Sequence, residues 1–432
     1  MSARPDATPP LARLQPALTL LPGSAAWQQW RAATLAQLVT DGLPTPRDDA
    51  WKYTNLRLLE RRELAPAAPR PLAANALEGL PEAQGPRLVY VNGRFHAALS
   101  DRSLPDGLVQ ASYRDLLDGA PPAAVTSPID ADQRIRQLNA CMAADGAQLT
   151  LSAGSNPRLP LEIVHLHTGG GAYPRTRLEL GANSSLALIE YQLGLGNADS
   201  FVAAVTDVIL DAGARLTHTT VQLAGDRTVM IDDAHAVVGR DARYAHRLVA
   251  LGGQLVRFDL RVDLDGTGAQ ADLRGVLFAD GTREQHIRTL LDHRVAHGTS
   301  DQLYRGVAGG RGRGSYDGKV IVRAGAAKTS SRQSSRNLLL STEASIDTRP
   351  QLEINADDVK CAHGATTGTL DENMLFYLLT RGLDRETARA LLTYAFVGDV
   401  LKSIEPEAVR RAIERRALGR LPAADTIREF IA

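Results

Sequence analysis

A cysteine and a histidine lie two residues apart in the last third of the chain, in the segment ADDVKCAHGATTG. If this segment is extended, Cys361 and His363 project from the same face, because side chains alternate along a strand. A thiolate beside an imidazole can bind soft or borderline metals such as zinc or iron. Two ligands do not complete a metal site, so we expect a partner surface to supply the others. On spacing alone, a packed thiol and a hydrogen-bonded histidine are the alternative.

Other polar clusters favour ordinary structural roles. Asp357 and Asp358 precede the cysteine and could orient a metal ligand, but paired acids in a turn are more often solvated. His293 and His297 are four residues apart, as in helical zinc sites, yet their surroundings have a strand pattern. The glycine-rich segment 309–318 is not a phosphate-binding loop, because valine and not serine or threonine follows its Gly-Lys pair. We expect no nucleotide site in this chain.

The elements that would position these residues are strands from about Gln148 to Ile354. In Val256–Leu264, apolar residues alternate with charged ones, which predicts a strand with one face in the core and the other in water. An apolar residue followed by a Gly/Ala/Asp turn recurs at intervals of 30, 28, 26, 31 and 27 residues, starting at Leu180, Leu210, Val238, Leu264, Val295 and Val322. Such a period predicts a solenoid, here a β-helix. A β-sandwich is the alternative, although its turns need not recur at fixed intervals.

Helical patterns flank the strands. Ala25–Val39 has apolar residues near helical spacing, and all three tryptophans lie in the first 51 residues, which predicts a separate N-terminal unit. Residues 1–23 have no lasting period and are expected to fray. Further helices are expected at Asp371–Leu379, Asp384–Ser403, Glu407–Ala417 and Ala423–Phe430. The predicted domains are an N-terminal helical and mixed region at 1–147, a β-helix core at 148–369 and a C-terminal helical domain at 370–432.

Composition excludes several classes of protein. The chain has 49 basic and 49 acidic residues, which removes the basic surface expected of a nucleic-acid-binding protein. No apolar run reaches the roughly 18 residues of a membrane span, and Ala17–Leu21 is too short for the core of a signal peptide. Two cysteines cannot make a disulfide framework and favour a reducing compartment. We expect a cytoplasmic protein that binds neither nucleic acid nor membrane.

Three segments of this chain resemble a known family. They are ADDVKCAHGATTG with the following LFYLLTRG, the upstream GSYDGKVIVRAGAAKTSSRQSSRNLLLSTEASIDTRPQLEI, and the early RDDAWKYTNL (Arg47–Leu56). All three resemble the SufB/SufD family of the Suf iron–sulfur cluster assembly complex, and within it the SufD type. The resemblance implies an all-β core with helical ends, in which a right-handed parallel β-helix is flanked by N-terminal and C-terminal helical regions. SufB has a sulfur-accepting cysteine in the segment that matches Gln333–Leu339, whereas this chain has Ser334 and Ser335 there, which puts that role in doubt.

The resemblance also implies a function. A SufD-type chain is a scaffold and not an enzyme; it pairs with SufB and binds the ATPase SufC through its C-terminal helical domain, and in isolation it could form a homodimer. Iron or an iron–sulfur cluster would pass transiently through the interface with SufB, where His363 first and Cys361 second would be metal ligands. Two alternatives stay open, a carbohydrate-active β-helix enzyme and a metal-trafficking chaperone that acts alone. The first would need an exposed acidic groove, and the second a metal site that is complete within this chain.

Overall fold

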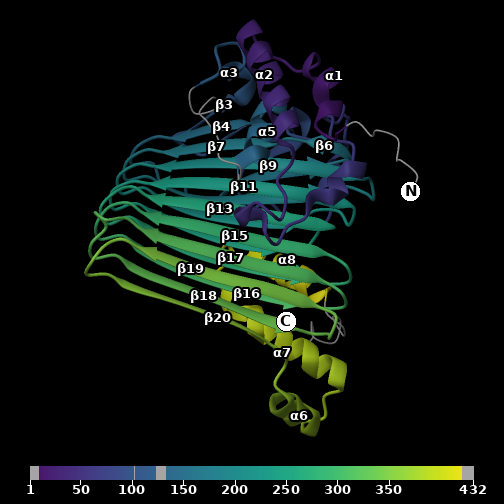
Figure 1. Ribbon diagram of the computed structural model, residues 1–432, viewed down its shortest axis with the longest axis vertical. Helices are drawn as coiled ribbons and strands as arrows, with labels where there is room; N and C mark the ends of the chain where they lie inside the picture. The colour runs from purple at the N-terminus through teal and green to yellow at the C-terminus, as the bar shows by residue number, and fades with distance from the viewer. Residues whose placement is uncertain (1–8, 102, 123–132, 421–432) are drawn as a thin grey trace.

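A parallel β-solenoid forms the centre of the molecule in the computed structural model, which describes residues 9–101, 103–122 and 133–420 (Figure 1). Its coils stack so that each coil adds one strand to each of two facing 10-stranded sheets. Sheet A contains β3 (Leu108–Ser112), β4 (Ala147–Leu151), β6 (Gly170–Ala172), β7 (Arg175–Leu180), β9 (Ser200–Leu210), β11 (Thr228–Val238), β13 (Leu255–Leu264), β15 (Glu284–His293), β17 (Arg313–Val322) and β19 (Ser345–Ile354). Sheet B contains β1 (Arg87–Val91), β2 (Arg94–Phe95), β5 (Leu161–His167), β8 (Ser185–Gly194), β10 (Arg215–Leu223), β12 (Arg243–Ala250), β14 (Gln270–Ala279), β16 (Thr299–Ala308), β18 (Ser330–Leu339) and β20 (Lys360–Gly368).

The turns that recur in the sequence connect the two sheets. Leu180, Leu210, Val238, Leu264 and Val322 are each the last residue of a strand in sheet A, and the turn that follows leads into sheet B. Strands of successive coils pair in parallel and in register, so inward-facing residues stack into ladders. The prediction of a parallel β-helix is confirmed, and the sandwich alternative is wrong.

The strand β13 has the predicted alternation, but its charged face is not in water. Phe258 faces the core and is 3% exposed, yet Arg257 and Asp263 are only 3% and 2% exposed. The N-terminal segment covers this face, where the Trp51 ring centroid lies 4.0 Å from the Arg257 guanidinium. His235 adds a 2.8 Å contact to Asp263. Alternation therefore predicted the inward face correctly and overlooked the cover on the outer one.

Most of the N-terminal helices pack on the outer face of sheet A. They are η1 (Ala12–Leu14), α1 (Gln15–Leu18), α2 (Ala25–Asp41), η2 (Asp49–Trp51), η3 (Leu56–Arg61), α3 (Tyr113–Leu116) and α5 (Arg134–Met142). The short helices η4 (Ala74–Leu77) and η5 (Ala97–Leu99) lie on the sheet B side, where Leu77 and Leu99 pack against the cluster that contains Val89. Trp27 and Leu35 of α2 share a buried cluster with Phe201 and Val229 of sheet A. Leu14 belongs to the same cluster, so the expectation of fraying is wrong from residue 9 onward, and residues 1–8 lie outside the described residues.

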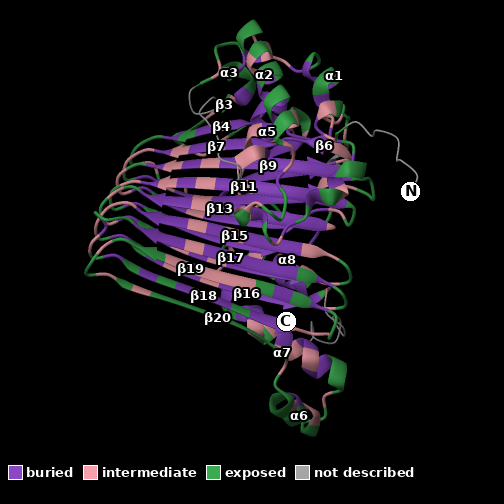
Figure 2. Ribbon diagram, viewed as in Figure 1, coloured by how far each residue is buried: buried purple, intermediate pink, exposed green. Residues whose placement is uncertain are grey.

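The C-terminal helices are α6 (Glu372–Thr380), α7 (Arg385–Leu401) and α8 (Glu407–Leu418), of which α7 and α8 pack on the outer face of sheet B. Val397 of α7 and Ile413 of α8 share a buried cluster with Val249 of sheet B. Helix α6 projects past the last coil and is largely exposed (Figures 1 and 2). The predicted helix Ala423–Phe430 lies outside the described residues.

The division at residue 147 stays a prediction, although β1 and β3 precede it and pair with β5 and β4. Within the described ranges, no helix is both long and apolar enough to cross a membrane.

Candidate functional site at the open end of the solenoid

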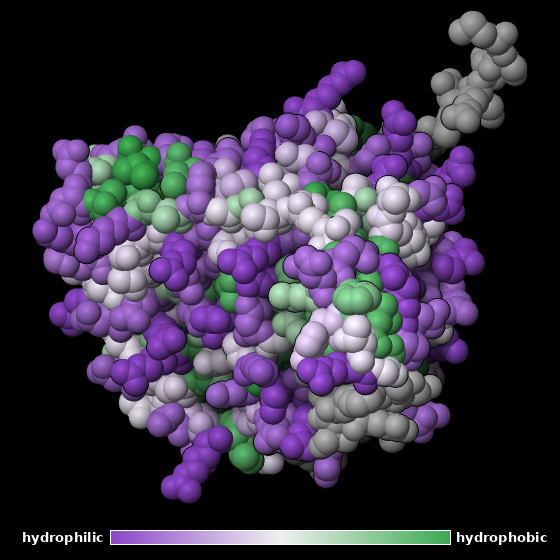
Figure 3. All heavy atoms as spheres, turned by 90° about the horizontal axis from the view of Figure 1, so that it is seen from below, coloured by the Kyte–Doolittle hydropathy of each residue, from purple (hydrophilic) through white to green (hydrophobic). Residues whose placement is uncertain are grey.

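The two ends of the solenoid differ in how they are covered. At the N-terminal end, short antiparallel strands close both sheets, with β2 on β1 and β3 on β4. At the other end β19 and β20 are the last strands of their sheets, and no described strand pairs with their outer edges. An unpaired edge presents a row of backbone donors and acceptors that can accept another strand. Figure 3 views the molecule from this end, where hydrophilic side chains surround smaller apolar patches.

Cys361 and His363 both lie on β20 and face the interior of the solenoid. Cys361 pairs in register with Ser331, and His363 pairs with Gln333. Both partners are buried, and in a parallel in-register sheet, paired residues point to the same side. The Cys361 side chain is half-buried against the core, whereas His363 is exposed because no described coil follows β20. The structure thus brings the two candidate ligands together on one face at the open end.

These two residues are at most part of a metal site within the described chain. Among residues 9–101, 103–122 and 133–420, no three His, Cys, Asp or Glu side chains are grouped so that they could hold a metal ion. Burial raises the pKa of the Cys361 thiol, so in the isolated chain this group is protonated at neutral pH. Asp358 is exposed and forms an ion pair with Lys328. Any further ligands would have to come from a second surface.

A buried polar cluster lies behind His363 in the last coils. Gln333 Nε2 donates a hydrogen bond to the hydroxyl of Tyr316 (2.9 Å), which in turn contacts Gln302 Oε1 (3.2 Å). Gly318 leaves room for this cluster, because a Cβ there would collide with Gln333 and Tyr316. Sequence reasoning missed these residues. The sequence did contain a signal for them. Gln302 and Gln333 are 31 residues apart and Gln333 and His363 are 30 apart, which matches the spacing of the recurring turns.

A second feature is the position of segment 47–55, here called the strap. The sequence marked this segment by its resemblance but did not predict that it runs over sheet A toward the open end. Arg349 of β19 donates to Asp49 of the strap (2.7 Å) and to Asp317 of β17 (2.6 Å). The hydrogen bond from Arg349 lowers the pKa of Asp49. Trp51, within this segment, is fully buried. The strap therefore joins the N-terminal unit to the last strand of sheet A.

His293, which the sequence singles out, and several other buried histidines have structural roles. His293 is buried, its Nε2 lies 2.9 Å from Ser300 Oγ, and burial lowers its pKa to about 4. His165 and His218 contact the two oxygens of Glu190 at 2.9 and 3.0 Å inside the solenoid. Burial opposes ionisation of Glu190, but the two histidines outweigh it and hold the pKa of this carboxyl below its usual value. These groups stabilise the middle coils and lie far along the ladder from His363.

Helix α6 carries an exposed apolar surface beside the open end. Met374, Phe376 and Tyr377 are 59%, 67% and 56% exposed, and Leu375 is the buried residue of this helix. These side chains stay uncovered because α6 contacts α7 and no sheet closely. An exposed apolar surface of this kind marks an interaction site.

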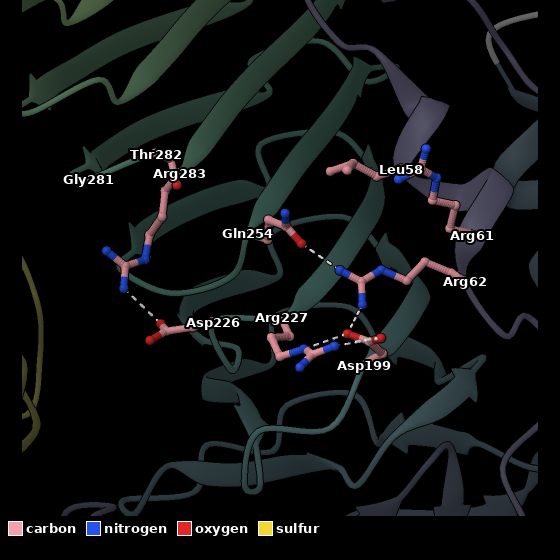
Figure 4. Close-up of a pocket in the computed structure, with 10 residues that line it drawn as sticks. All are labelled: Leu58, Arg61, Arg62, Asp199, Asp226, Arg227, Gln254, Gly281, Thr282 and Arg283. Atoms are coloured by element: carbon pink, nitrogen blue, oxygen red, sulfur yellow. Dashed lines mark hydrogen bonds and ion pairs between the residues drawn. The ribbon is translucent and has the colours of Figure 1, made fainter.

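A pocket beside the turns of the solenoid is lined by arginines and aspartates that form ion pairs with one another (Figure 4). Arg62, next to η3, forms an ion pair with Asp199, and Arg227 donates to both oxygens of the same carboxylate (2.7 and 3.0 Å). Across the pocket, Arg283 donates to Asp226 (2.8 Å). Arg62 therefore joins the N-terminal segment to the turn that precedes β9, and the other two pairs join the turns that precede β9, β11 and β15 to one another.

Comparisons with known proteins agree with this architecture. Residues 164–396, more than half of the chain, match the family described as SUF system FeS cluster assembly, SufBD core domain. The chain is 30% identical over 400 residues to the iron–sulfur cluster assembly protein SufD of Escherichia coli K12, which covers 90% of this chain and 92% of that protein. It is 26% identical over 430 residues to the chloroplastic protein ABCI7 of Arabidopsis thaliana (94% and 89%). It is 25% identical over 286 residues to SufD of Bacillus subtilis 168 (65% of each).

The matched region spans β5 to α7 and includes both strands of the open end and the Cys361–His363 pair. Sequence, fold and site therefore lead to one assignment: this chain belongs to the SufBD family of the SUF iron–sulfur cluster assembly system.

Proposed function

We propose that this chain is a non-catalytic scaffold subunit that pairs with a SufB-type subunit through the open end of its solenoid. The observation that carries the proposal is that the unpaired edges of β19 and β20 and the Cys361–His363 pair lie at the same end. Strand addition to these edges would satisfy the backbone groups and continue the two sheets into the partner. The same pairing would place the partner's side chains against His363. Assembly and completion of the metal site would then be one event.

Iron or an iron–sulfur cluster is the cargo of this interface. An imidazole and a thiol suit iron as ligands, and a partner would supply the missing ones. The half-site disfavours a chaperone acting alone, because the described residues do not complete a metal site. His363 is the stronger ligand candidate, because it is exposed at the open end, while partial burial raises the pKa of the Cys361 thiol and keeps it protonated. The unpaired cysteines favour a reducing compartment such as the cytoplasm for this function.

A SufC-type ATPase would bind the exposed apolar surface of α6. Met374, Phe376 and Tyr377 lie on a helix that projects from the body, so a partner can cover them without moving the solenoid. Phe376→Asp should abolish SufC binding and leave pairing with SufB intact. Removing every residue after Leu383 would be a poorer test, because α7 and α8 cover a buried cluster on sheet B.

The decisive experiment is anaerobic co-purification of this chain with SufB and SufC, with iron and sulfide counted per complex. His363→Asn should leave the three-subunit complex intact, because one imidazole contributes little to a large interface, and should lower iron content severely. His297→Asn is the matched control, since His297 is an exposed histidine in a turn with φ of 64°, a conformation that asparagine tolerates. Normal iron in the His363→Asn complex would remove this residue from the site. If the chain forms a homodimer and does not bind SufB when the two are purified together, the proposed pairing is refuted.

A further inference from the structure

An unsatisfied acceptor lies directly behind His363. Gln333 is the residue that pairs with His363 in the inward ladder of sheet B. Its side chain is 1% exposed, and its Oε1 has no hydrogen-bond partner among the described residues. Buried polar groups in folded proteins nearly always have a partner, so this oxygen calls for a donor. The pairing partner on the next strand is a histidine, whose ring carries an N–H in its neutral form.

The hydrogen-bond network fixes which end of the Gln333 amide faces outward. Thr289 donates its hydrogen to Gln302 Oε1 (2.8 Å), and Tyr316 donates to the same oxygen (3.2 Å). The Tyr316 oxygen then accepts from Gln333 Nε2 (2.9 Å), because its only hydrogen is already donated. Burial raises the pKa of Tyr316 to about 12, which keeps that hydrogen in place. The nitrogen of Gln333 is thereby held toward Tyr316, and Oε1 is left to accept.

In-register pairing places His363 on the strand next to Gln333, although in the structure the two side chains form no hydrogen bond. Adjacent strands of a sheet lie about 4.8 Å apart, so a side chain on one strand can contact its paired neighbour on the next. The flanking inward residues of β20 are Cys361, whose register partner is Ser331, and Ala365, which has no polar group. Three other buried donors have no partner among the described residues: the hydroxyl of Thr348 on the facing strand β19, the hydroxyl of Ser335 on β18, and the amide nitrogen of Gln302, which pairs in register with Gln333. Of these, Thr348 provides the control.

We propose that Gln333 is a positioning residue for His363, in that its Oε1 accepts a hydrogen bond from one ring N–H and selects one neutral tautomer. The other ring nitrogen then faces the open end with its lone pair available for iron. Histidine ligands of metals are held in this way by an acceptor on their second nitrogen, and loss of the acceptor typically weakens metal binding 10- to 100-fold. The inference rests on the proposed function for the role of His363 as a ligand. The tautomer itself does not depend on that role.

The test is the ring ¹⁵N spectrum of histidine-labelled protein without metal, recorded at about pH 8.5, where an exposed imidazole is neutral. The His363 signals are assigned by their loss in His363→Asn. The wild type should show one tautomer at His363, Gln333→Leu a mixture of both, and Gln333→Glu the wild-type tautomer again, because a carboxylate restores the acceptor. Thr348→Val should leave the signature unchanged. Should Gln333→Leu fail to fold, Tyr316→Phe removes the hydroxyl that orients the amide and should also produce a mixture.

A Gln333→Leu spectrum identical to that of the wild type would overturn the inference, and so would a mixture caused by Thr348→Val. In the complex with SufB, Gln333→Leu should weaken iron binding about 10-fold or more. Failure of the proposed function gives a different result. Normal iron in His363→Asn would remove the ligand role, while the metal-free tautomer would still report on Gln333.

Discussion

Replacing Phe258 tests the core of the solenoid most directly. Its ring is 3% exposed and stacks on His246, with centroids 5.2 Å apart and planes inclined by 11°. Phe258→Ala should cost about 3–5 kcal/mol of unfolding free energy, because it loses buried area and leaves a cavity. Phe258→Asp should cost more. It places a carboxyl next to Asp232 in the same ladder, and burial already raises the pKa of Asp232 well above its usual value.

Burial favours the neutral form of the new carboxyl as it does for Asp232, and burying a carboxyl without a hydrogen-bond partner costs about 1–3 kcal/mol. Added to the cavity, this approaches the roughly 5–15 kcal/mol that stabilises an ordinary domain, so Phe258→Asp should not fold. The assay is urea unfolding followed by far-UV circular dichroism, because all three tryptophans lie within residues 27–51 and report on the N-terminal unit. Phe376→Ala, on exposed α6, should stay within about 0.5 kcal/mol of the wild type. A folded Phe258→Asp protein, or a Phe258→Ala cost below 1 kcal/mol, would refute the assignment of Phe258 to a packed interior.

Three further predictions concern protonation, the thiol and the strap. His293 has a pKa of about 4 in the folded protein against about 6.5 when unfolded, so wild-type stability should fall as pH drops from 6.5 to 4, by up to about 1.4 kcal/mol per unit from this residue. His293→Gln should remove that part of the pH dependence in urea unfolding, and an unchanged slope would contradict the burial argument. Cys361→Ser should lower the iron content of the proposed complex with SufB less than His363→Asn does, because burial keeps the thiol protonated. An equal loss of iron in the two variants would show that Cys361 contributes to iron binding as much as His363 does. Asp49→Asn should change the unfolding free energy by no more than about 1 kcal/mol, since Asp49 is exposed. It should nevertheless speed amide hydrogen exchange in β19, because the contact with Arg349 is lost. Exchange rates equal to those of the wild type would show that the strap does not stabilise that strand.

The solenoid could be predicted from sequence because its repeat is local. A coil must return to the same sheet after a nearly constant number of residues, so apolar strand ends such as Leu210 and Val238 recur with that period. The inward orientation of the Phe258 side chain could be predicted from the alternation of apolar and charged residues within one strand. The cover over Arg257 could not be predicted in this way, because Trp51 lies 206 residues away in sequence and no local pattern connects the two.

Of the residues of the candidate site, only Cys361 and His363 could be predicted from sequence. Strand alternation places Cys361 and His363 on one face whatever surrounds them. The role of Gln333 depends on register between coils, which a single strand does not specify. Applying the spacing of the turns to inward-facing positions, and not only to strand ends, would have predicted this register. The exposure of Phe376 could not be predicted, because helical spacing alone does not specify what a helix packs against.

The contact of Asp49 with Arg349 has a consequence for how the two ends of the chain communicate. Arg349 belongs to the strand whose outer edge is open, and it is held from one side by Asp317 and from the other by the strap. Whatever pairs with β19 acts on a strand that is bonded to a segment about 300 residues earlier in the chain. Coupling between two sites is reciprocal, so if occupation of the edge protects the strap, loosening the strap weakens binding at the edge by the same free energy. Protease cleavage within residues 47–55 would therefore report, from the far side of the sequence, whether the open end is occupied.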